Sequence, residues 1–550
     1  MASLAAFALP LLCHAQLPAA ATAPDTTSRV VDRVFAAWRD TESPGCALSV
    51  SSNGRMVYER GYGMANLETA TPIRPNSIFH VASVSKQFTA MAIMLLARDG
   101  KLSVDDNIRK FLPEIPDYGT PITIRHLLTH TSGLRDQWTL LSMARGRFEE
   151  DRITEADVMD IVPRQKALNF TPGAEYLYSN TGFTLLGVIV KRVSGQSLRA
   201  FADERIFKPL GMTSTHFHDD YTMLVPNRTS AYEMRADGWH VGIPNFDVYG
   251  ATSLFTTTGD LLKWEANFER PVVGDRALFD QMETPARLTN GDTTTYGFGL
   301  VVARYRGARV VEHNGDDAGY RSYVGRFPDH GLAIAIACNA STANTTLLAR
   351  GVADAYLGKA LAPVAAPVAS APQAVTLPPG SLEKRAGAYI QPTTQQVVEL
   401  VMRNGALSAG QANGPALVPT AENRFRLGQA ELVFAAGEHA GFELRPLADG
   451  GRPVSYEWRP AAVASAAVLG AYAGEYFSEE LNARYRVAAT DSNITLRTGT
   501  SNPLPARMVF VDGFQAGGYT IQFVRRRGQV SGFEITDGRV RRVMFERVGK

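Results

Sequence analysis

Hydrophobic and polar residues follow two different periods along the first two thirds of the chain. Residues 46–63 alternate in the manner of two strands around an Asn-Gly pair at 53–54, which is the strongest short signal for a hairpin turn. Residues 86–100 and 182–195 carry apolar side chains at helical spacing, and residues 331–341 form a short apolar run typical of a buried strand. This mixture predicts an α/β domain.

The pattern changes after a proline-rich segment. Residues 361–380 contain five prolines and no charged residue, which is typical of an extended linker. Beyond it, short alternating segments with frequent glycine predict antiparallel β structure. The sequence around Gly387 recurs around Gly474, and the sequence around Gly441 recurs around Gly532 at a similar offset. We therefore predict two copies of a small antiparallel β-barrel.

These patterns divide the chain into five segments. We predict a signal peptide and N-terminal tail, a large α/β domain, a linker, a first barrel and a second barrel, at residues 1–27, 28–360, 361–380, 381–462 and 463–550.

The first segment is apolar and has an A-x-A-like cleavage site before Gln16, so it resembles a secretory signal peptide and predicts export to the periplasm or medium. No basic residue precedes Arg29, which leaves a cytoplasmic protein open if the segment is no signal. Cleavage would leave Cys46 and Cys338 as the thiols of the mature chain. Both lie in apolar runs, and we interpret them as two buried structural thiols, although the sequence does not decide whether they pair.

Composition excludes several classes of protein. With 550 residues, 45% hydrophobic and 20% charged, the chain is an ordinary globular protein and neither disordered nor a disulfide-stapled miniature. The net charge of +2 and the lack of a basic stripe give no footprint for nucleic acid. No internal apolar run is long enough to predict a membrane span.

Two histidine pairs are the candidates for a metal site. His216 and His218 would share one face of a strand, and His126 and His130 would share one face of a helix. Neither pair has a marked third ligand, so we interpret all four as structural and predict no metal and no cofactor. The oligomeric state is not readable from the sequence.

The strongest chemical signal is Ser83-Val84-Ser85-Lys86, directly ahead of the helical pattern. A serine at a helix start and a lysine three residues later lie on one face, one turn apart. A buried lysine with a lowered pKa can accept the proton of the serine hydroxyl, which is a weak nucleophile by itself. Alone, this S-x-x-K pattern is common, and its serines could equally cap a helix.

Further motifs follow in order. These are the segment ITIRHLLTHTSGL at 122–134, Tyr178-Ser179-Asn180, and His313-Asn314-Gly315. With S-x-x-K, the set resembles the serine β-lactamase and penicillin-binding-protein superfamily, and the tandem β modules resemble its D-aminopeptidase and alkaline D-peptidase branch. The resemblance implies a β-lactamase/transpeptidase-like fold of α+β type, with a five-stranded antiparallel sheet, flanking helices and a helical subdomain, followed by two lipocalin-like barrels.

The resemblance also implies roles for single residues. Ser83 would be the nucleophile, Lys86 its base and Tyr178 a second proton shuttle made useful by the nearby cationic lysine. Asn180 would orient the substrate amide. His313 would stabilise an anion or the substrate from the last motif.

Substrate binding would continue along the last motif. Gly315 would border the substrate, and the backbone amides of Ser83 and Asp316 would form the oxyanion hole. Asp316 and Asp317 could attract an ammonium group such as a peptide N-terminus, or could simply face water. The resemblance further implies that a loop of the last module, within 465–550, covers the site.

The implied activity is hydrolysis of a small peptide, amide or ester, and a D-aminopeptidase is the favoured interpretation. A D-Ala-D-Ala carboxypeptidase, an esterase or a weak β-lactamase are the alternatives, and His313 in place of the lactamase lysine weakens the last. A penicillin- or peptide-binding sensor that deacylates slowly is the alternative of another class.

Overall fold

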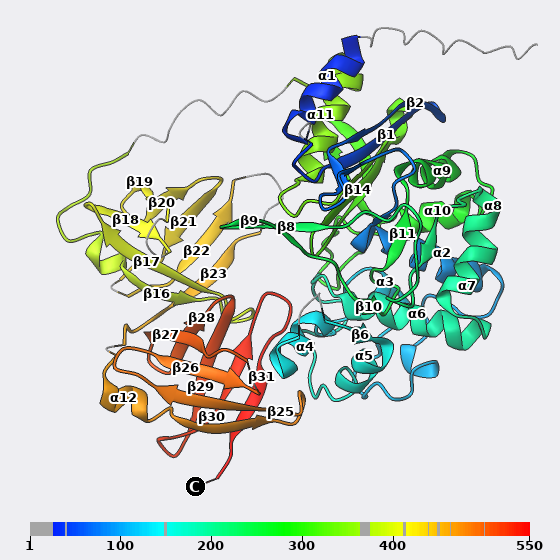
Figure 1. Ribbon diagram of the computed structural model, residues 1–550. Coiled ribbons are helices and arrows are strands. Elements are labelled where there is room, and N and C mark those ends of the chain that lie inside the picture. Colours follow the sequence, from blue (N-terminus) through cyan, green and yellow to red (C-terminus); the bar gives the residue numbers. More distant parts are fainter. Residues whose placement is uncertain are drawn as a thin grey trace, which may run out of the picture.

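The computed structural model describes residues 26–38, 41–147, 151–363, 374–410, 414–437, 439–447, 452–462, 464–499 and 501–549. Figure 1 shows a mixed helix and sheet domain with two β modules on one side, the first yellow and the second orange to red. Most of the predicted signal segment and the centre of the predicted linker, residues 364–373, lie outside the described residues.

The large domain is built on one antiparallel sheet of six strands. Their order is β12-β13-β14-β15-β1-β2, with bounds β1 (Cys46–Ser52), β2 (Arg55–Tyr62), β12 (Val301–Tyr305), β13 (Ala308–Asp317), β14 (Tyr320–Phe327) and β15 (Leu332–Cys338). The hairpin predicted at Asn53-Gly54 is confirmed, with positive φ at both residues. The expected number of five strands is wrong. A second two-residue turn with positive φ, at Arg306-Gly307, pairs β12 with β13 at the edge and brings the sheet to six.

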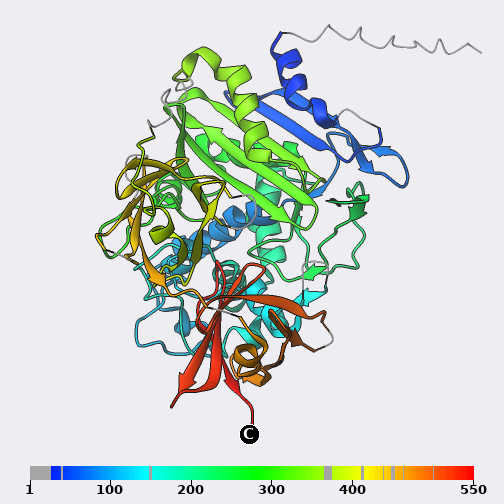
Figure 2. The ribbon, with the colours of Figure 1, turned by 90° about the vertical axis from the view of Figure 1, so that its left-hand side faces the viewer.

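Strand β15 is the apolar run predicted at 331–341. Its side chains are apolar on both sides because both faces of the sheet are covered. Ile334 and Ile336 pack in one core with the helices α1 (Thr26–Val34) and α11 (Thr345–Leu357), and Figure 2 shows α11 lying across the strands. Ala333, Ala335 and Ala337 belong to the core on the other side, where α9 (Thr258–Glu269) contacts β15 and β1. Small residues there let helices approach closely.

A helical subdomain packs against that second core. Its central helices are α2 (Ser85–Arg98) and α6 (Asn180–Ser194), which confirm the two predicted helical patterns. All residues of α2 from Ser85 to Leu96 are buried, so the helix is apolar nearly all round, as expected of a central helix. The other helices are α3 (Ile124–Leu128), α4 (Gln137–Arg145), α5 (Glu155–Ile161), α7 (Leu198–Ala202), α8 (Lys208–Leu210) and α10 (Arg276–Met282), with a π-helical turn at Asp203–Phe207.

Short strands join these parts of the large domain. They are β3 (Met64–Asn66), β4 (Thr71–Pro72), β5 (Phe79–His80), β6 (Ile153–Thr154), β7 (His216–Phe217), β8 (Tyr232–Arg235), β9 (Gly238–Val241), β10 (Phe246–Asp247) and β11 (Leu254–Thr256). Strand β5 of the sheet β5-β11-β7 lies just ahead of α2 in the chain, and Leu254 of β11 hydrogen-bonds to Val81 and Ser85 at the start of the helix.

The second β module is a closed barrel of eight strands. They are β24 (Gly474–Ser478), β25 (Ala483–Ala489), β26 (Ile494–Thr498), β27 (Leu504–Phe510), β28 (Gly513–Ala516), β29 (Tyr519–Arg526), β30 (Gln529–Thr536) and β31 (Val543–Arg547), preceded by α12 (Ala466–Gly470). Its interior is filled by aromatic rings such as those of Tyr476, Phe523 and Phe533.

The first β module also has eight strands but remains an open sheet, so the prediction of a closed barrel is wrong for it. The strands are β16 (Gly387–Ile390), β17 (Val397–Arg403), β18 (Ala406–Ala409), β19 (Val418–Ala421), β20 (Arg424–Leu427), β21 (Ala430–Phe434), β22 (Phe442–Pro446) and β23 (Val454–Arg459). The edges β18 and β19 are not paired in the sheet, and an isolated bridge, Ser408 to Ala416, joins β18 to the segment just ahead of β19. Pro419 within β19 has no N–H with which to extend a ladder.

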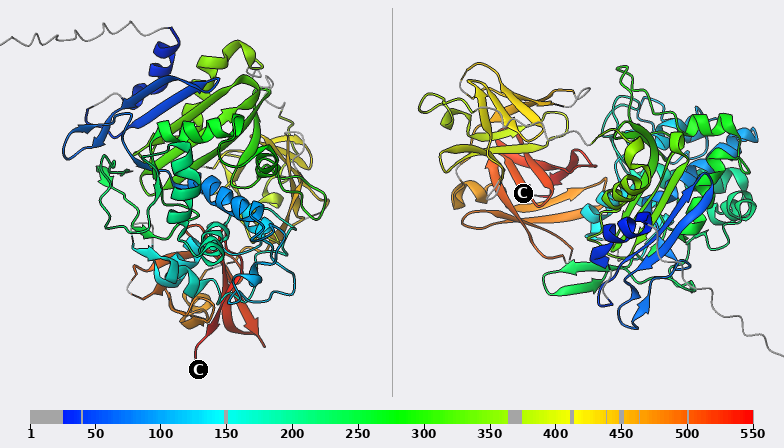
Figure 3. Two further views of the ribbon diagram at one scale, coloured as in Figure 1. Left: turned by 90° about the vertical axis from the view of Figure 1, so that its right-hand side faces the viewer. Right: turned by 90° about the horizontal axis from the view of Figure 1, so that it is seen from above.

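The internal repeat is confirmed as a structural repeat. Gly387 and Gly474 begin the first strand of each module, and Gly441 and Gly532 lie at or within the seventh. Figure 3 shows the two modules together at one side of the large domain. No helix in the described ranges has the length and apolar character needed to cross a membrane.

Cys46 and Cys338 form a disulfide, which corrects the interpretation of two buried thiols. They are direct partners in the register of β1 and β15, and their Cα atoms are 4.0 Å apart. Directly opposed residues of antiparallel strands lie only about 4.5–5.5 Å apart, so register alone brings the two side chains together. The pairing joins positions 292 residues apart, and it arises from strand register rather than from any local pattern.

We predict that the Cys46→Ala/Cys338→Ala double variant loses about 2–4 kcal/mol of unfolding free energy, because the bridge restricts a long loop in the unfolded chain. Urea unfolding with and without dithiothreitol measures this loss. The reductant should lower the midpoint of the unaltered protein and leave that of the double variant unchanged. An unaltered protein insensitive to reductant under unfolding conditions would contradict the prediction.

Candidate active site

Ser83 lies in a short 3-10 turn, η2 (Ala82–Val84), that leads directly into α2. The preceding Ala82 is fully buried and has φ of 46°, a conformation that non-glycine residues rarely adopt and that neighbours must enforce. Ser85 provides part of that support: its hydroxyl donates to the Ala82 carbonyl at 2.5 Å and accepts from the Leu254 amide at 3.0 Å. The turn is therefore fixed from both sides.

Lys86 lies under Ser83 and is fully buried. Its Nζ atom is 2.9 Å from Ser83 Oγ, 2.9 Å from Asn180 Oδ1 and 2.6 Å from the Ala251 carbonyl. These are three acceptors for the three protons of an ammonium group. After loss of one proton, the two remaining N–H groups can serve Asn180 and Ala251, which leaves the lone pair for the Ser83 hydroxyl.

Burial lowers the pKa of Lys86 to about 7. The carboxylates of Asp317 and Asp136 oppose this shift and the guanidinium of Arg539 adds to it, but the loss of hydration dominates. A substantial fraction of Lys86 is therefore an unprotonated amine near neutral pH. Such an amine can take the proton of Ser83 when the hydroxyl attacks.

Asp136 holds the amide of Asn180 in the orientation that Lys86 requires. The Asp136 carboxylate accepts from Asn180 Nδ2 at 2.9 Å and from the Asn180 backbone N–H at 2.7 Å, so that Oδ1 faces the lysine. Asp136 is fully buried and also caps α4. Asp136 is not among the site residues predicted from the sequence, although its place before a helix marks it as a cap.

The ring of Tyr178 lies near two basic side chains, Lys86 and Arg539. Lys86 Nζ is 4.9 Å from the ring centroid and Arg539 Cζ is 5.0 Å from it. Burial raises the pKa of the phenol well above its usual value, and a hydrogen bond with Ser83 and the Arg539 charge oppose this only in part. Tyr178 is therefore protonated near neutral pH, which suits a proton donor.

His313 is buried on β13 and both of its ring nitrogens have partners. Nε2 lies 2.8 Å from the Tyr296 hydroxyl and Nδ1 lies 2.6 Å from the Asn314 carbonyl, which fits a neutral ring that donates from Nδ1 and accepts at Nε2. Burial lowers its pKa to about 3. At neutral pH His313 carries no charge with which to stabilise an anion, so its geometry favours a positioning role.

The end of β13 places Gly315, Asp316 and Asp317 beside Ser83. A Cβ atom on Gly315 would lie 2.9 Å from the Ser83 amide nitrogen and 2.3 Å from the Val81 carbonyl, so no side chain fits there. This close approach sets the β13 backbone at Gly315 next to the Ser83 amide, one residue before Asp316, whose amide is the second donor of the expected oxyanion hole.

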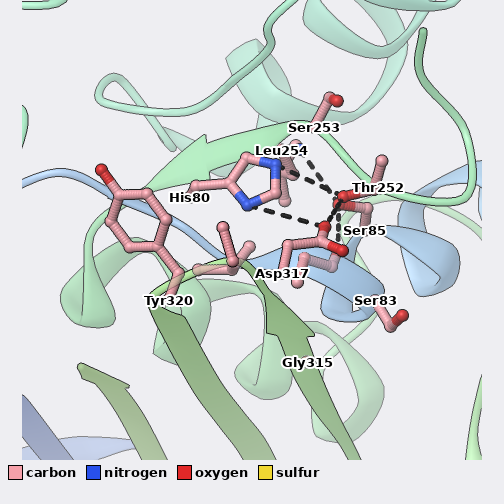
Figure 4. A network of polar contacts seen from close by, with 12 residues as sticks. His80, Ser83, Ser85, Thr252, Ser253, Leu254, Gly315, Asp317 and Tyr320 are labelled. Atoms are coloured by element: carbon pink, nitrogen blue, oxygen red, sulfur yellow. Dashed lines mark hydrogen bonds and ion pairs between the residues drawn. The ribbon is translucent and has the colours of Figure 1, made fainter. Parts of the chain in front are cut away.

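The two aspartates differ in environment. The Asp316 side chain is 55% exposed, is paired with Arg321 at 3.3 Å and accepts from Asn314. Asp317 is buried and lies between His80 and Thr252 (Figure 4), accepting from the Thr252 hydroxyl, with 3.8 Å to His80 Nδ1. Burial lowers the pKa of His80 to about 3, so this neighbour of Asp317 is neutral near pH 7.

A cavity of about 340 Å³ joins these residues. The predicted residues on its wall are Ser83, Tyr178, Asn180, His313, Asp316 and Asp317, and the unpredicted ones are Trp138, Asn314 and Arg539. Trp138 comes from α4 and Arg539 from the loop between β30 and β31 of the closed barrel. The barrel loop that the family resemblance implied is therefore present at the site.

The four histidines considered for a metal have structural partners instead. His126 Nδ1 accepts from the Thr123 amide at the start of α3, and His130 Nδ1 accepts from the Ser179 amide beside Tyr178. His216 and His218 lie 3.3 Å apart, nitrogen to nitrogen. Within the described residues, no group of three side chains is arranged to hold a metal ion.

We predict that the rate of Ser83 acylation rises with pH and levels off above about 7, because only unprotonated Lys86 accepts the serine proton. The value of kcat/KM for p-nitrophenyl acetate, corrected with the Ser83→Ala variant, should increase about tenfold per pH unit well below the pKa. A profile that is flat from pH 5 to 8, or that rises only near pH 10, would show that Lys86 is not the base.

Comparison with known proteins places this site in a family. The profile of the beta-lactamase family matches residues 30–359. Penicillin-binding protein 4* of Bacillus subtilis is 31% identical over 298 residues. The match covers 51% of this chain and 64% of that protein, which is less than two thirds of its length. A D-aminopeptidase of Cereibacter sphaeroides is 24% identical over 551 residues, 95% of this chain and 99% of that protein. The solved structure of an octameric penicillin-binding protein homologue from Pyrococcus abyssi has the same fold, with a TM-score of 0.56 at 21% identity over 86% of this chain and 99% of that one. The chain belongs to the beta-lactamase family.

Proposed function

We propose that the protein is a serine hydrolase that releases the amino-terminal residue of short D-amino-acid peptides or amides through an acyl-enzyme on Ser83. The observation that carries this proposal is the buried Lys86 amine, 2.9 Å from Ser83 Oγ and with a pKa lowered to about 7. The D-aminopeptidase relative, aligned over nearly the whole chain, supports the substrate class.

In the acylation step, Ser83 Oγ attacks the substrate carbonyl and its proton passes to Lys86. The carbonyl oxygen becomes an oxyanion, for which the Ser83 and Asp316 amides are the available donors. Tyr178, protonated and hydrogen-bonded to Ser83, donates a proton to the leaving amine and recovers one from Lys86. The products are an ester on Ser83 and a neutral amine.

In the deacylation step, water attacks the ester. Lys86 is unprotonated again and accepts a proton from the water as it attacks. Lys86 then returns this proton to the leaving Ser83 oxygen, so that the acid is released and the enzyme is restored. Because Asn180 and Ala251 retain Lys86 through both steps, the lysine needs no movement between its two protonation states.

Recognition of an amino terminus would use the acidic end of β13. Asp316 and Asp317 both border the cavity. Carboxylates attract the ammonium group of an unblocked amino terminus. An N-acetylated substrate would lack this interaction.

We also propose that the protein is exported. The apolar first residues resemble a secretory signal, and the Cys46–Cys338 disulfide is of the kind that persists in oxidising compartments. Fractionation of cells that produce the full chain tests this, and accumulation of an uncleaved, reduced protein in the cytoplasm would contradict it.

We predict Ser83-dependent release of p-nitroaniline from D-alanine p-nitroanilide, with slower release from the L-enantiomer and from N-acetyl-D-alanine p-nitroanilide. The Ser83→Ala substitution should lower kcat by at least about 1,000-fold, as loss of the nucleophile does in other serine hydrolases. Steady-state rates of the unaltered protein and Ser83→Ala on the three anilides measure this.

Mass spectrometry of the same reactions separates the alternatives. Hydrolysis of simple esters without the anilides would indicate an esterase. An acyl group that stays on Ser83 at one per molecule would indicate a slowly deacylating sensor. Equal rates of Ser83→Ala and the unaltered protein would remove Ser83 from the mechanism.

A further inference from the structure

Arg539 brings a guanidinium from the closed barrel into the cavity of the large domain. It lies on the loop between β30 and β31, its Cζ atom is 5.0 Å from the centroid of the Tyr178 ring, and it lines the cavity with Ser83. More than 350 residues separate Tyr178 from Arg539 in the chain. The site is therefore composite, with a cation supplied by a separate module.

The loop that carries Arg539 is held firmly. The Arg539 carbonyl accepts from Asn169 Nδ2 at 2.9 Å, and the Asp537 carboxylate accepts from the Arg539 backbone N–H at 2.7 Å. Next to it, Arg541 pairs with Glu175 at 2.9 Å, and the buried Arg135 donates to the Arg541 carbonyl at 2.7 Å. A backbone fixed by both domains presents its side chain at low entropic cost.

The positive charge of Arg539 is available to a ligand. Among the ion pairs of the described residues, none includes its guanidinium. Asp537 is near enough for Arg539 to influence its pKa, but its carboxylate is engaged with backbone N–H groups of the loop. A guanidinium stays charged at all relevant pH values and binds carboxylates through two parallel hydrogen bonds.

The other basic groups of the site cannot serve an anion in this way. Lys86 is buried, uses its protons on Ser83, Asn180 and Ala251, and loses one near pH 7. His313 is neutral. Arg539 is thus the permanent cation on the cavity wall, whereas the acidic pair is on β13.

We propose that Arg539 binds the free carboxylate of the leaving group, so that the substrates are short peptides, of dipeptide length, with both ends unblocked. This inference rests on the proposed function. In the proposed mechanism Tyr178 donates a proton to the leaving amine. Because Arg539 lies over the Tyr178 ring, a substrate carboxylate that binds its guanidinium belongs to the leaving residue. A cavity of about 340 Å³ is at the small end of ligand pockets and suits such a substrate.

The test compares D-alanyl-D-alanine with its C-terminal amide, which differs in the carboxylate alone. For the unaltered protein, kcat/KM for the free acid should exceed that for the amide by about tenfold to a hundredfold, the range of hydrogen bonds to charged groups. The ratio should fall to about one in Arg539→Gln. Because both substrates react with the same Ser83 and Lys86, any change in the Lys86 pKa cancels from the ratio.

Arg542→Gln is the matched control. Arg542 lies on the same loop and directs its guanidinium to the Pro392 carbonyl, away from the cavity, so this variant should keep the preference of the unaltered protein. A ratio near one in the unaltered protein, or a preference that survives in Arg539→Gln, would overturn the inference.

Binding measurements separate this inference from the proposed function. Calorimetry on the Ser83→Ala variant, which cannot form the acyl-enzyme, gives Kd for the free acid and the amide without turnover. Tighter binding of the acid that disappears in Ser83→Ala/Arg539→Gln would support the role of Arg539 even if neither peptide were hydrolysed. Equal Kd values for acid and amide would refute it, even if hydrolysis depended on Ser83.

Discussion

The chemistry of this protein depends on keeping one lysine side chain out of water. An exposed lysine is almost entirely protonated near neutral pH and cannot take a proton from serine. Lys86 escapes this because burial costs the ammonium form more than the nearby carboxylates of Asp136 and Asp317 return. Much of the surrounding structure serves to hold a group that the interior disfavours when charged.

Each neighbouring element contributes one part of that arrangement. Helix α2 brings Lys86 under Ser83, α6 provides Asn180, and the segment before β11 provides the Ala251 carbonyl. Asp136 fixes Asn180, and the six-stranded sheet closes the site through the end of β13. The barrel adds Arg539 from outside, with an effect on both the Lys86 pKa and the cavity wall. A change in any of these elements would therefore alter proton transfer as well as shape.

Local patterns in the sequence predicted the parts of the fold that local physics determines. The Asn-Gly hairpin, the helices α2 and α6 and the paired β modules could be read from spacing and glycine positions. The Cys46–Cys338 bridge, the contact of Asp136 with Asn180 and the place of Arg539 could not, because each arises from the pairing of distant segments. Whether the first module closes into a barrel also depends on the pairing of its two edge strands, which the spacing of apolar residues does not reveal.

Burial decides the protonation states that the sequence leaves open. His313 was expected to stabilise an anion or the substrate, and complete enclosure by groups such as Tyr296 keeps it neutral. Tyr178 was expected to be a proton shuttle, and loss of hydration keeps it protonated, which suits a proton donor. Sequence identifies which groups titrate, whereas the depth of burial sets the direction in which their pKa values move.

The most direct measurement of this account is the titration of Lys86 itself. ¹³C NMR of protein labelled at the lysine Cε atoms, with the resonance assigned by its loss in Lys86→Met, follows the protonation of this side chain without any substrate. We predict one lysine resonance that titrates near pH 7, while exposed lysines titrate near their usual value of about 10.4. A Lys86 resonance that shows no titration below about pH 9 would contradict a lowered Lys86 pKa.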